Sequence, residues 1–228
     1  MPPKGMFVGS QRPKGLEFAS CPDCNRKSSR LDDFAAFLVS AFSQNELSDA
    51  QAKHFLKKFK GLQNNNPLLL DELNFRTATT SDGKTLVDKS GSEFGAMFVD
   101  GPLASDAIFR FGAKVGMALH YQATNEIAAS DHRVVVFAFT NANAVNGEIP
   151  LGLFDLLPER SMLAQGKITS EGIFEYQSAK VRDGKGSAHW ATLGASIYYN
   201  LFVGPNMILP EEKRGFCRTF LPGCLQRH

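Results

Sequence analysis

Two cysteines and an asparagine near the start of the chain have the spacing of a metal-binding turn. Cys21 and Cys24 are separated by two residues, and a turn of that length can bring both thiolates onto one tetrahedral cation such as zinc. Asn25 follows directly, and its amide oxygen is an uncharged hard ligand suited to Mg²⁺ or Mn²⁺. The spacing therefore predicts a metal-binding knuckle at residues 21–25.

The knuckle lies in a basic part of the chain. Within residues 1–30, six basic and two acidic side chains give a net charge of +4, whereas the whole chain carries +2, so residues 31–228 carry −2. A basic surface of this size is consistent with binding to a polyanion such as nucleic acid, and equally with a surface that contacts only solvent. The candidates for phosphate contact are Lys4, Arg26, Lys27 and Arg30.

Three stretches within the first forty residues resemble the HNH (ββα-metal) endonuclease family. The Cys-x-x-Cys-Asn knuckle is similar to the last part of the HNH motif. Residues 2–7, Pro-Pro-Lys-Gly-Met-Phe, resemble the segment that follows the catalytic His in one branch of that family. Residues 28–34 resemble the start of the helix behind the knuckle.

The resemblance implies a metal-dependent endonuclease that hydrolyses phosphodiester bonds, with DNA as the expected partner. By this resemblance, Cys21 and Cys24 match half of a structural zinc site, and Asn25 matches the motif position that contacts the catalytic Mg²⁺ or Mn²⁺. The His that activates water would directly precede Pro2, and the partner Cys-x-x-Cys would lie further upstream. The central Asn of the motif is absent at residues 14–16. We therefore expect an N-terminally truncated chain that is inactive as written.

Other interpretations of the cysteines stay open. The knuckle can serve a non-catalytic binding or structural protein, or Cys21 and Cys24 can be an unligated or redox pair in an α+β domain of another role. Cys217 and Cys224 can complete a four-thiolate site if the C-terminal tail folds back onto the knuckle.

The histidines give weaker signals. His54, His120 and His189 each fall beside apolar residues and are interpreted as packing or surface side chains. His132 follows Asp131, which suggests a base with an orienting carboxylate. Adjacent residues of a strand point to opposite faces, however, so this pair is a poor catalytic candidate.

The composition is that of a globular protein. The chain has 228 residues, of which 43% are hydrophobic and 21% charged. Its four cysteines do not form the framework of a disulfide-rich secreted domain. The sequence shows neither a signal peptide nor an apolar run of the roughly 20 residues that span a bilayer. We expect a soluble cytoplasmic protein without a membrane partner.

Hydrophobic periodicity predicts helices first and strands later. Helices are expected from about Ser29, from Ser48 with Gln51 completing a capping box, over residues 68–73, and over residues 103–123. A hairpin is expected over residues 74–90, and strands over residues 133–140, 151–157, 173–181 and 188–203, the last with a bulge at Gly194. Strands joined by turns predict an α+β fold with an antiparallel sheet. The expected domains are an HNH-like knuckle and helical region (residues 1–73) and an α+β region (residues 74–228).

Overall fold

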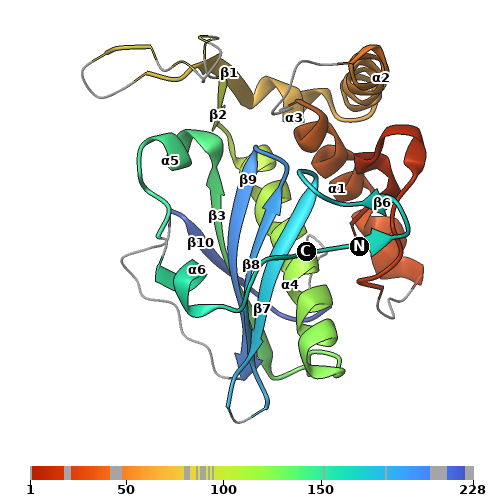
Figure 1. Ribbon diagram of the computed structural model, residues 1–228, viewed down its shortest axis with the longest axis vertical. Coiled ribbons are helices and arrows are strands. Elements are labelled where there is room, and N and C mark those ends of the chain that lie inside the picture. Colours follow the sequence, from red (N-terminus) through yellow and green to blue (C-terminus); the bar gives the residue numbers. More distant parts are fainter. Residues whose placement is uncertain are drawn as a thin grey trace.

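The computed structural model places most of the chain (Figure 1). It describes residues 2–17, 22–41, 48–79, 83–85, 87, 91, 93, 95–150, 152–182, 184–205 and 215–223. The side chains of Asp23, Cys24, Lys27 and Leu153 lie outside this description. The described residues form helices and antiparallel strands, which confirms the α+β class.

A six-stranded antiparallel sheet forms the centre of the molecule. Its strand order is β10-β3-β9-β8-β7-β4. Its strands are β3 (His132–Thr140), β4 (Ser161–Met162), β7 (Phe174–Lys180), β8 (Ser187–Leu193), β9 (Ile197–Pro205) and β10 (Cys217–Phe220). β7, β8 and β9 follow one another through short turns, whereas β3 pairs with β9 across a long stretch of sequence. The short strands β5 (Ala164–Gln165) and β6 (Ile168–Thr169) pair with each other outside this sheet.

Helix α4 (Pro102–Thr124) packs along one face of the sheet (Figure 1). Proline is well tolerated in the first turn of a helix, and Asn125 ends α4 in the left-handed conformation with a φ of 62°. Gly112 lets the helix approach closely, because a Cβ there would lie 2.6 Å from Val136 Cγ1 and 2.7 Å from Tyr199 Cε1. α4 and the sheet enclose much of the main core. Fully buried side chains in this layer include Phe111, Leu119, Phe174, Tyr199 and Leu201.

Three helices from the first part of the chain each pack against the next, and the first and third of them also contact α4. They are α1 (Pro22–Ala41), α2 (Asp49–Asn65) and α3 (Pro67–Asp71). α1 buries Phe34, Phe37 and Leu38, and the ring of Phe37 lies 6.0 Å from that of Phe55 in α2. An ion pair of 2.6 Å between Asp32 Oδ1 and Lys114 Nζ connects α1 to α4.

The N-terminus of α2 is capped as the sequence predicts. The backbone N–H of Gln51 donates to Ser48 Oγ at 3.3 Å, and the backbone N–H of Ser48 donates to Gln51 Oε1 at 2.9 Å. This reciprocal pair satisfies amide groups that a bare helix end leaves without partners. A second capping box, between Thr140 and Asn143, opens α5 (Asn141–Val145).

Residues 2–17 form a loop-rich segment against α1. It contains two short 3-10 turns, Lys4–Met6 and Val8–Ser10, and buries Met6 and Phe7. A Cβ on Gly5 would lie 3.2 Å from Ala36 Cβ, so the first turn lies beside the middle of α1.

The structure corrects several boundaries. α1 begins at Pro22 rather than near Ser29, because Pro22 suits the first helical position and the polar residues after it tolerate a solvated helix. Residues 151–157 were expected to form a strand, but Gly152–Leu156 form the short helix α6. A short apolar run does not by itself distinguish a strand from one helical turn.

The β-structure also differs in two places. The predicted single strand over residues 188–203 is two strands, β8 and β9, because residues 194–196 form a turn with Gly194 at a φ of 55°. The hairpin predicted over residues 74–90 is not the main strand pairing in this part of the chain. β1 (Leu73–Thr77) pairs with β2 (Gly95–Val99), and isolated bridges join Thr79 to Thr85 and Val87 to Glu93.

One hydrophobic cluster runs through both predicted regions of the chain. It includes Met6, Phe34 and Leu62 from the first 73 residues, and Val134 and Leu201 from the rest. The domain boundary after residue 73 stays a prediction. Among the described helices, none combines the length and the apolar character needed to cross a lipid bilayer.

Candidate functional site

Residues 22–25 of the predicted knuckle form the first turn of α1. Asn25 and Arg26 are exposed there, so any ligand of these side chains can approach from solvent. Ser28 Oγ donates to the Asn25 carbonyl at 3.1 Å, a bond within the helix that leaves the Asn25 side chain uninvolved. Of the predicted zinc ligands, Cys21 lies outside the described residues, and so does the side chain of Cys24.

The predicted phosphate-binding residues divide into two groups. Arg26 and Arg30 are exposed and four residues apart on α1, so they share one face of the helix. Lys4 is exposed in the first 3-10 turn, beside the middle of α1. Ala36 is about 16 Å from Asn25 along the helix axis, at a rise of 1.5 Å per residue. The structure therefore brings Arg26 and Arg30 together and sets Lys4 apart, while the Lys27 side chain is outside the described residues.

Cys217 is a poor partner for the knuckle. It is buried in β10, opposite Phe137 of β3. Arg218, the next residue, donates to Asp106 and Ser105 of α4, so Cys217 points to the other face of the sheet. α1 packs on the α4 side. This arrangement disfavours a four-thiolate site shared by Cys217 and the knuckle, and Cys224 lies outside the described residues.

A buried cluster of three histidines and two serines lies between α4 and the sheet. Ser187 Oγ is 2.7 Å from His120 Nδ1 and 2.7 Å from His189 Nε2. His189 Nδ1 is 2.9 Å from Ser178 Oγ. These contacts form a continuous chain of hydrogen bonds from the half-buried Ser178 on β7 to His120 on α4. His132, on β3, completes the cluster, since its ring lies edge-to-face against that of His120 with the centroids 5.6 Å apart.

Burial dominates the electrostatics of this cluster. Desolvation, followed by the nearby His120, lowers the pKa of His189 to about 3, so the ring is neutral at physiological pH. Desolvation and then His132 lower the pKa of His120 in the same way. Two ring nitrogens in the cluster, His120 Nε2 and His132 Nδ1, are buried without a hydrogen-bond partner.

From the sequence, each histidine is interpreted separately, and their association in one cluster is not predicted. His120 and Ser187 are 67 residues apart, and no local pattern connects a helix end to a distant strand. The nearest signal is the short connection between the strands expected over residues 173–181 and 188–203. It brings Ser178 and His189 close in a hairpin, and the structure pairs them directly.

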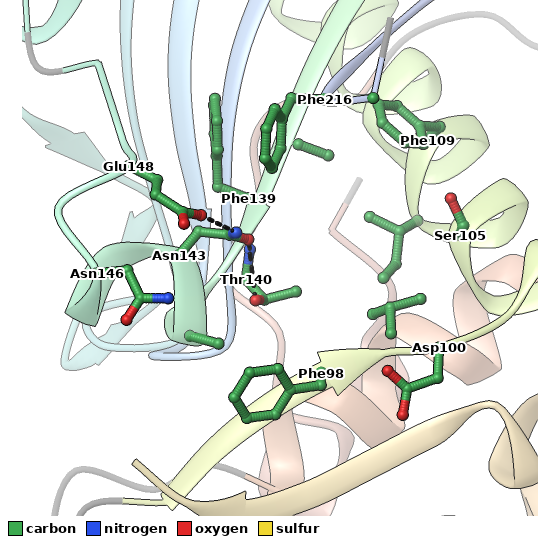
Figure 2. A pocket seen from close by; sticks show the side chains of 15 residues that line it. Phe98, Asp100, Ser105, Phe109, Phe139, Thr140, Asn143, Asn146, Glu148 and Phe216 are labelled. Atoms are coloured by element: carbon green, nitrogen blue, oxygen red, sulfur yellow. Dashed lines mark hydrogen bonds between the residues drawn. The ribbon is translucent and has the colours of Figure 1, made fainter. Parts of the chain in front are cut away.

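A cleft of about 370 Å³ opens near one end of the sheet (Figure 2). It lies between β2, the first turns of α4, the end of β3 and α5. Its aromatic walls are Phe98, Phe109, Phe139 and Phe216. The rings of Phe139 and Phe216 stack with centroids 5.6 Å apart and planes 21° apart.

One polar corner of the cleft is fixed by Asn143. Its Oδ1 accepts from the backbone N–H of Thr140 at 2.8 Å, and its Nδ2 donates to Glu148 Oε2 at 2.6 Å. Asp100 and Glu148 are the acidic residues among the described lining, which includes no Lys, Arg or His. Aromatic walls with two carboxylates suit a ligand that has a flat or apolar body and hydrogen-bond donors.

No group of three or more His, Cys, Asp or Glu side chains that could hold a metal ion occurs among the residues that the structure describes. Comparison of the chain with models of protein families, with curated proteins and with solved structures gave no match.

Proposed function

We propose that this protein is an HNH-like, metal-dependent endonuclease whose substrate is nucleic acid, in the first instance DNA. The observation that carries the proposal is the Cys-x-x-Cys-Asn sequence at residues 21–25, of which residues 22–25 form the first turn of α1. In this proposal Cys21 and Cys24 hold a structural zinc ion, and Asn25 contacts a catalytic Mg²⁺ or Mn²⁺. A divalent ion neutralises the charge that develops on the leaving phosphate oxygen.

The position of the knuckle supports the proposal. Asn25, Arg26 and Arg30 are exposed on consecutive turns of α1, where a bulky polyanion can reach them. Lys4 is exposed too, but it lies apart from these residues, in the turn beside Ala36. Phosphate contacts of this kind bind nucleic acid without regard to sequence and weaken as salt rises.

We expect that the chain as written does not cleave DNA. Residues 1–20 contain no histidine that could take a proton from water. The second candidate function follows from the same fact. Without a base, the knuckle serves a non-catalytic protein that binds nucleic acid or stabilises a complex. In either case we place the protein in the cytoplasm, a reducing compartment that keeps thiols available for metal.

A plasmid-nicking assay with Mg²⁺ or Mn²⁺ tests these roles. It compares the 228-residue chain with a variant in which Glu-His stands directly before Pro2, each with and without Asn25→Ala. We expect cleavage only by the Glu-His variant, and loss of that cleavage in Asn25→Ala. A general base contributes about 10²–10⁴ in rate, so the difference is well within the range of the assay.

Two results would change the proposal. Metal-dependent nicking by the original chain that disappears in Asn25→Ala would mean that another residue supplies the base, and His54, His120 and His132 would be tested first. A folded Glu-His variant that binds DNA without nicking it would favour the non-catalytic function. Metal analysis complements the assay, because two thiolates are half of a closed site and should hold zinc only weakly.

A further inference from the structure

Two imidazole nitrogens in the histidine cluster have no protein partner. His120 is 1% exposed and His132 is 8% exposed, yet His120 Nε2 and His132 Nδ1 are buried without a hydrogen bond. Leaving one buried polar group unsatisfied costs about 1–3 kcal/mol. Two such groups on adjoining rings therefore indicate an occupant that supplies what the protein does not.

The hydrogen-bond chain restricts the state of His120 Nε2. Ser187 Oγ has a single hydrogen, so it can donate to His120 Nδ1 or to His189 Nε2 but not to both. When Ser187 donates to His189, His120 Nδ1 donates to Ser187 Oγ, and His120 Nε2 carries a free lone pair. In this arrangement His189 Nδ1 donates to Ser178 Oγ, so every nitrogen of His189 is satisfied.

We propose that His120 Nε2 and His132 Nδ1 together bind one divalent transition-metal ion of the zinc class. Neutral imidazole is a preferred ligand of zinc, nickel and copper. Two imidazoles on one tetrahedral ion, with nitrogen–metal distances of about 2.0–2.1 Å, hold their ring centroids about 5 Å apart. The centroids of His120 and His132 are 5.6 Å apart, with ring planes at 84°.

The second nitrogen of His120 has the partner that a metal ligand requires, and the second nitrogen of His132 has a carboxylate nearby. Ligating histidines usually donate their second N–H to an oxygen, which fixes the tautomer and the direction of the ring. His120 Nδ1 is 2.7 Å from Ser187 Oγ, and His132 Nε2 is 4.0 Å from Asp131 Oδ1. Asp131 is exposed, so its carboxylate can close on His132 when a cation binds.

This site is independent of the proposed nuclease site, and the test separates the two. Zn²⁺ is titrated by calorimetry into the full chain carrying Cys21→Ser and Cys24→Ser, which removes the knuckle thiols. We expect one zinc per chain, and at least a tenfold loss of affinity in His120→Gln and in His132→Gln. His54→Gln is the matched control, because His54 also has a buried nitrogen without a partner but lies in α2.

Ser187→Ala tests the supporting hydrogen bond. Loss of a partner behind a ligand typically weakens metal binding by 10–100-fold, so we expect a loss in that range. The chemical shifts of the imidazole nitrogens in NMR spectra identify the ligating atoms and do not depend on the stability of a variant. If His120→Gln does not fold, His132→Asn is measured in its place, because His132 is the more exposed of the two rings.

Three results would overturn the proposal. The first is the absence of zinc binding by the folded double serine variant, which would leave water alone between the two rings. The second is zinc binding that His120→Gln and His132→Gln leave unchanged. The third is an equal loss of affinity in His54→Gln.

Discussion

The predicted site at the start of α1 and the histidine cluster differ in how their residues are brought together. At the start of α1 the candidate residues are neighbours in sequence, and Asn25 and Arg26 are exposed in the structure. In the cluster they come from α4, β3, β7 and β8, and the rings of His120 and His189 are almost fully buried. A motif in sequence therefore indicates the first site, whereas only the fold assembles the second. The two sites should also respond differently to substitution.

The largest expected effect separates the two ends of α1. Leu38 is buried near the C-terminal end of the helix, whereas Asn25 is exposed at the other end. We expect Leu38→Ala to lower the free energy of unfolding by about 2–5 kcal/mol through the cavity that it leaves. Asn25→Ala should change it by no more than about 0.5 kcal/mol. Urea unfolding measures both, and similar values for the two variants would contradict this division.

The second prediction concerns the ion pair that connects α1 to α4. Lys114 is buried, and its Nζ is 2.6 Å from Asp32 Oδ1. Lys114→Met should cost about 3 kcal/mol, because it leaves the partly buried Asp32 carboxylate without its partner. Asp32→Asn should cost at least as much, because it leaves the more buried Lys114 ammonium without a counter-charge. A double-mutant cycle measures the coupling, and additive costs would show that the pair does not join the helices.

The third prediction uses pH to examine the buried cluster. In the unfolded chain His189 takes up a proton near pH 6.5, whereas burial keeps it neutral in the folded protein down to about pH 3. Its contribution is therefore complete above pH 6.5 and is lost as the pH falls below that value, by about 1.4 kcal/mol per pH unit. Unfolding free energies between pH 6.5 and 5.5 measure this slope. His189→Gln should reduce it, and an unchanged slope would mean that other groups cause it.

The smallest expected effect on stability belongs to the exposed arginines. Arg26→Gln and Arg30→Gln should each change the unfolding free energy by less than about 0.5 kcal/mol. If the start of α1 binds nucleic acid, each substitution should remove about one phosphate contact. The slope of log K for DNA binding against log salt concentration should then become shallower by about 1. Binding measured at several salt concentrations provides the slope. Arg133→Gln, on β3, is a matched control for the loss of one positive charge elsewhere.

Local signals predicted the elements well. The capping box of Ser48 and Gln51 placed the start of α2, and the apolar repeat over residues 103–123 placed α4 within one residue at each end. The run over residues 133–140 corresponds to β3, apart from His132. In each case the residues that define the element also make its hydrogen bonds or its buried face, so a short window contains the information.

Long-range contacts escaped prediction for a physical reason. Residues 151–157 have the composition of a strand, but their conformation depends on the surroundings, where Phe154 lies 5.1 Å from the ring of Trp190. The histidine cluster depends on α4 crossing the sheet at the distance that Gly112 permits. The knuckle was visible in the sequence, but its chemistry stays a prediction, because Cys21 lies outside the described residues.

The pairing of β3 with β9 has a consequence for the order of events during folding. Thr140 and Ile197 are the nearest partners in that ladder, so 56 residues must be synthesised between them before the central pair of strands can form. β7, β8 and β9 need only two short turns and can assemble as a meander beforehand. Loop-closure entropy makes such long-range pairing slow. On the ribosome, α4 emerges long before β9, so its sheet-facing side has no complete surface to cover until most of the chain has left the exit tunnel.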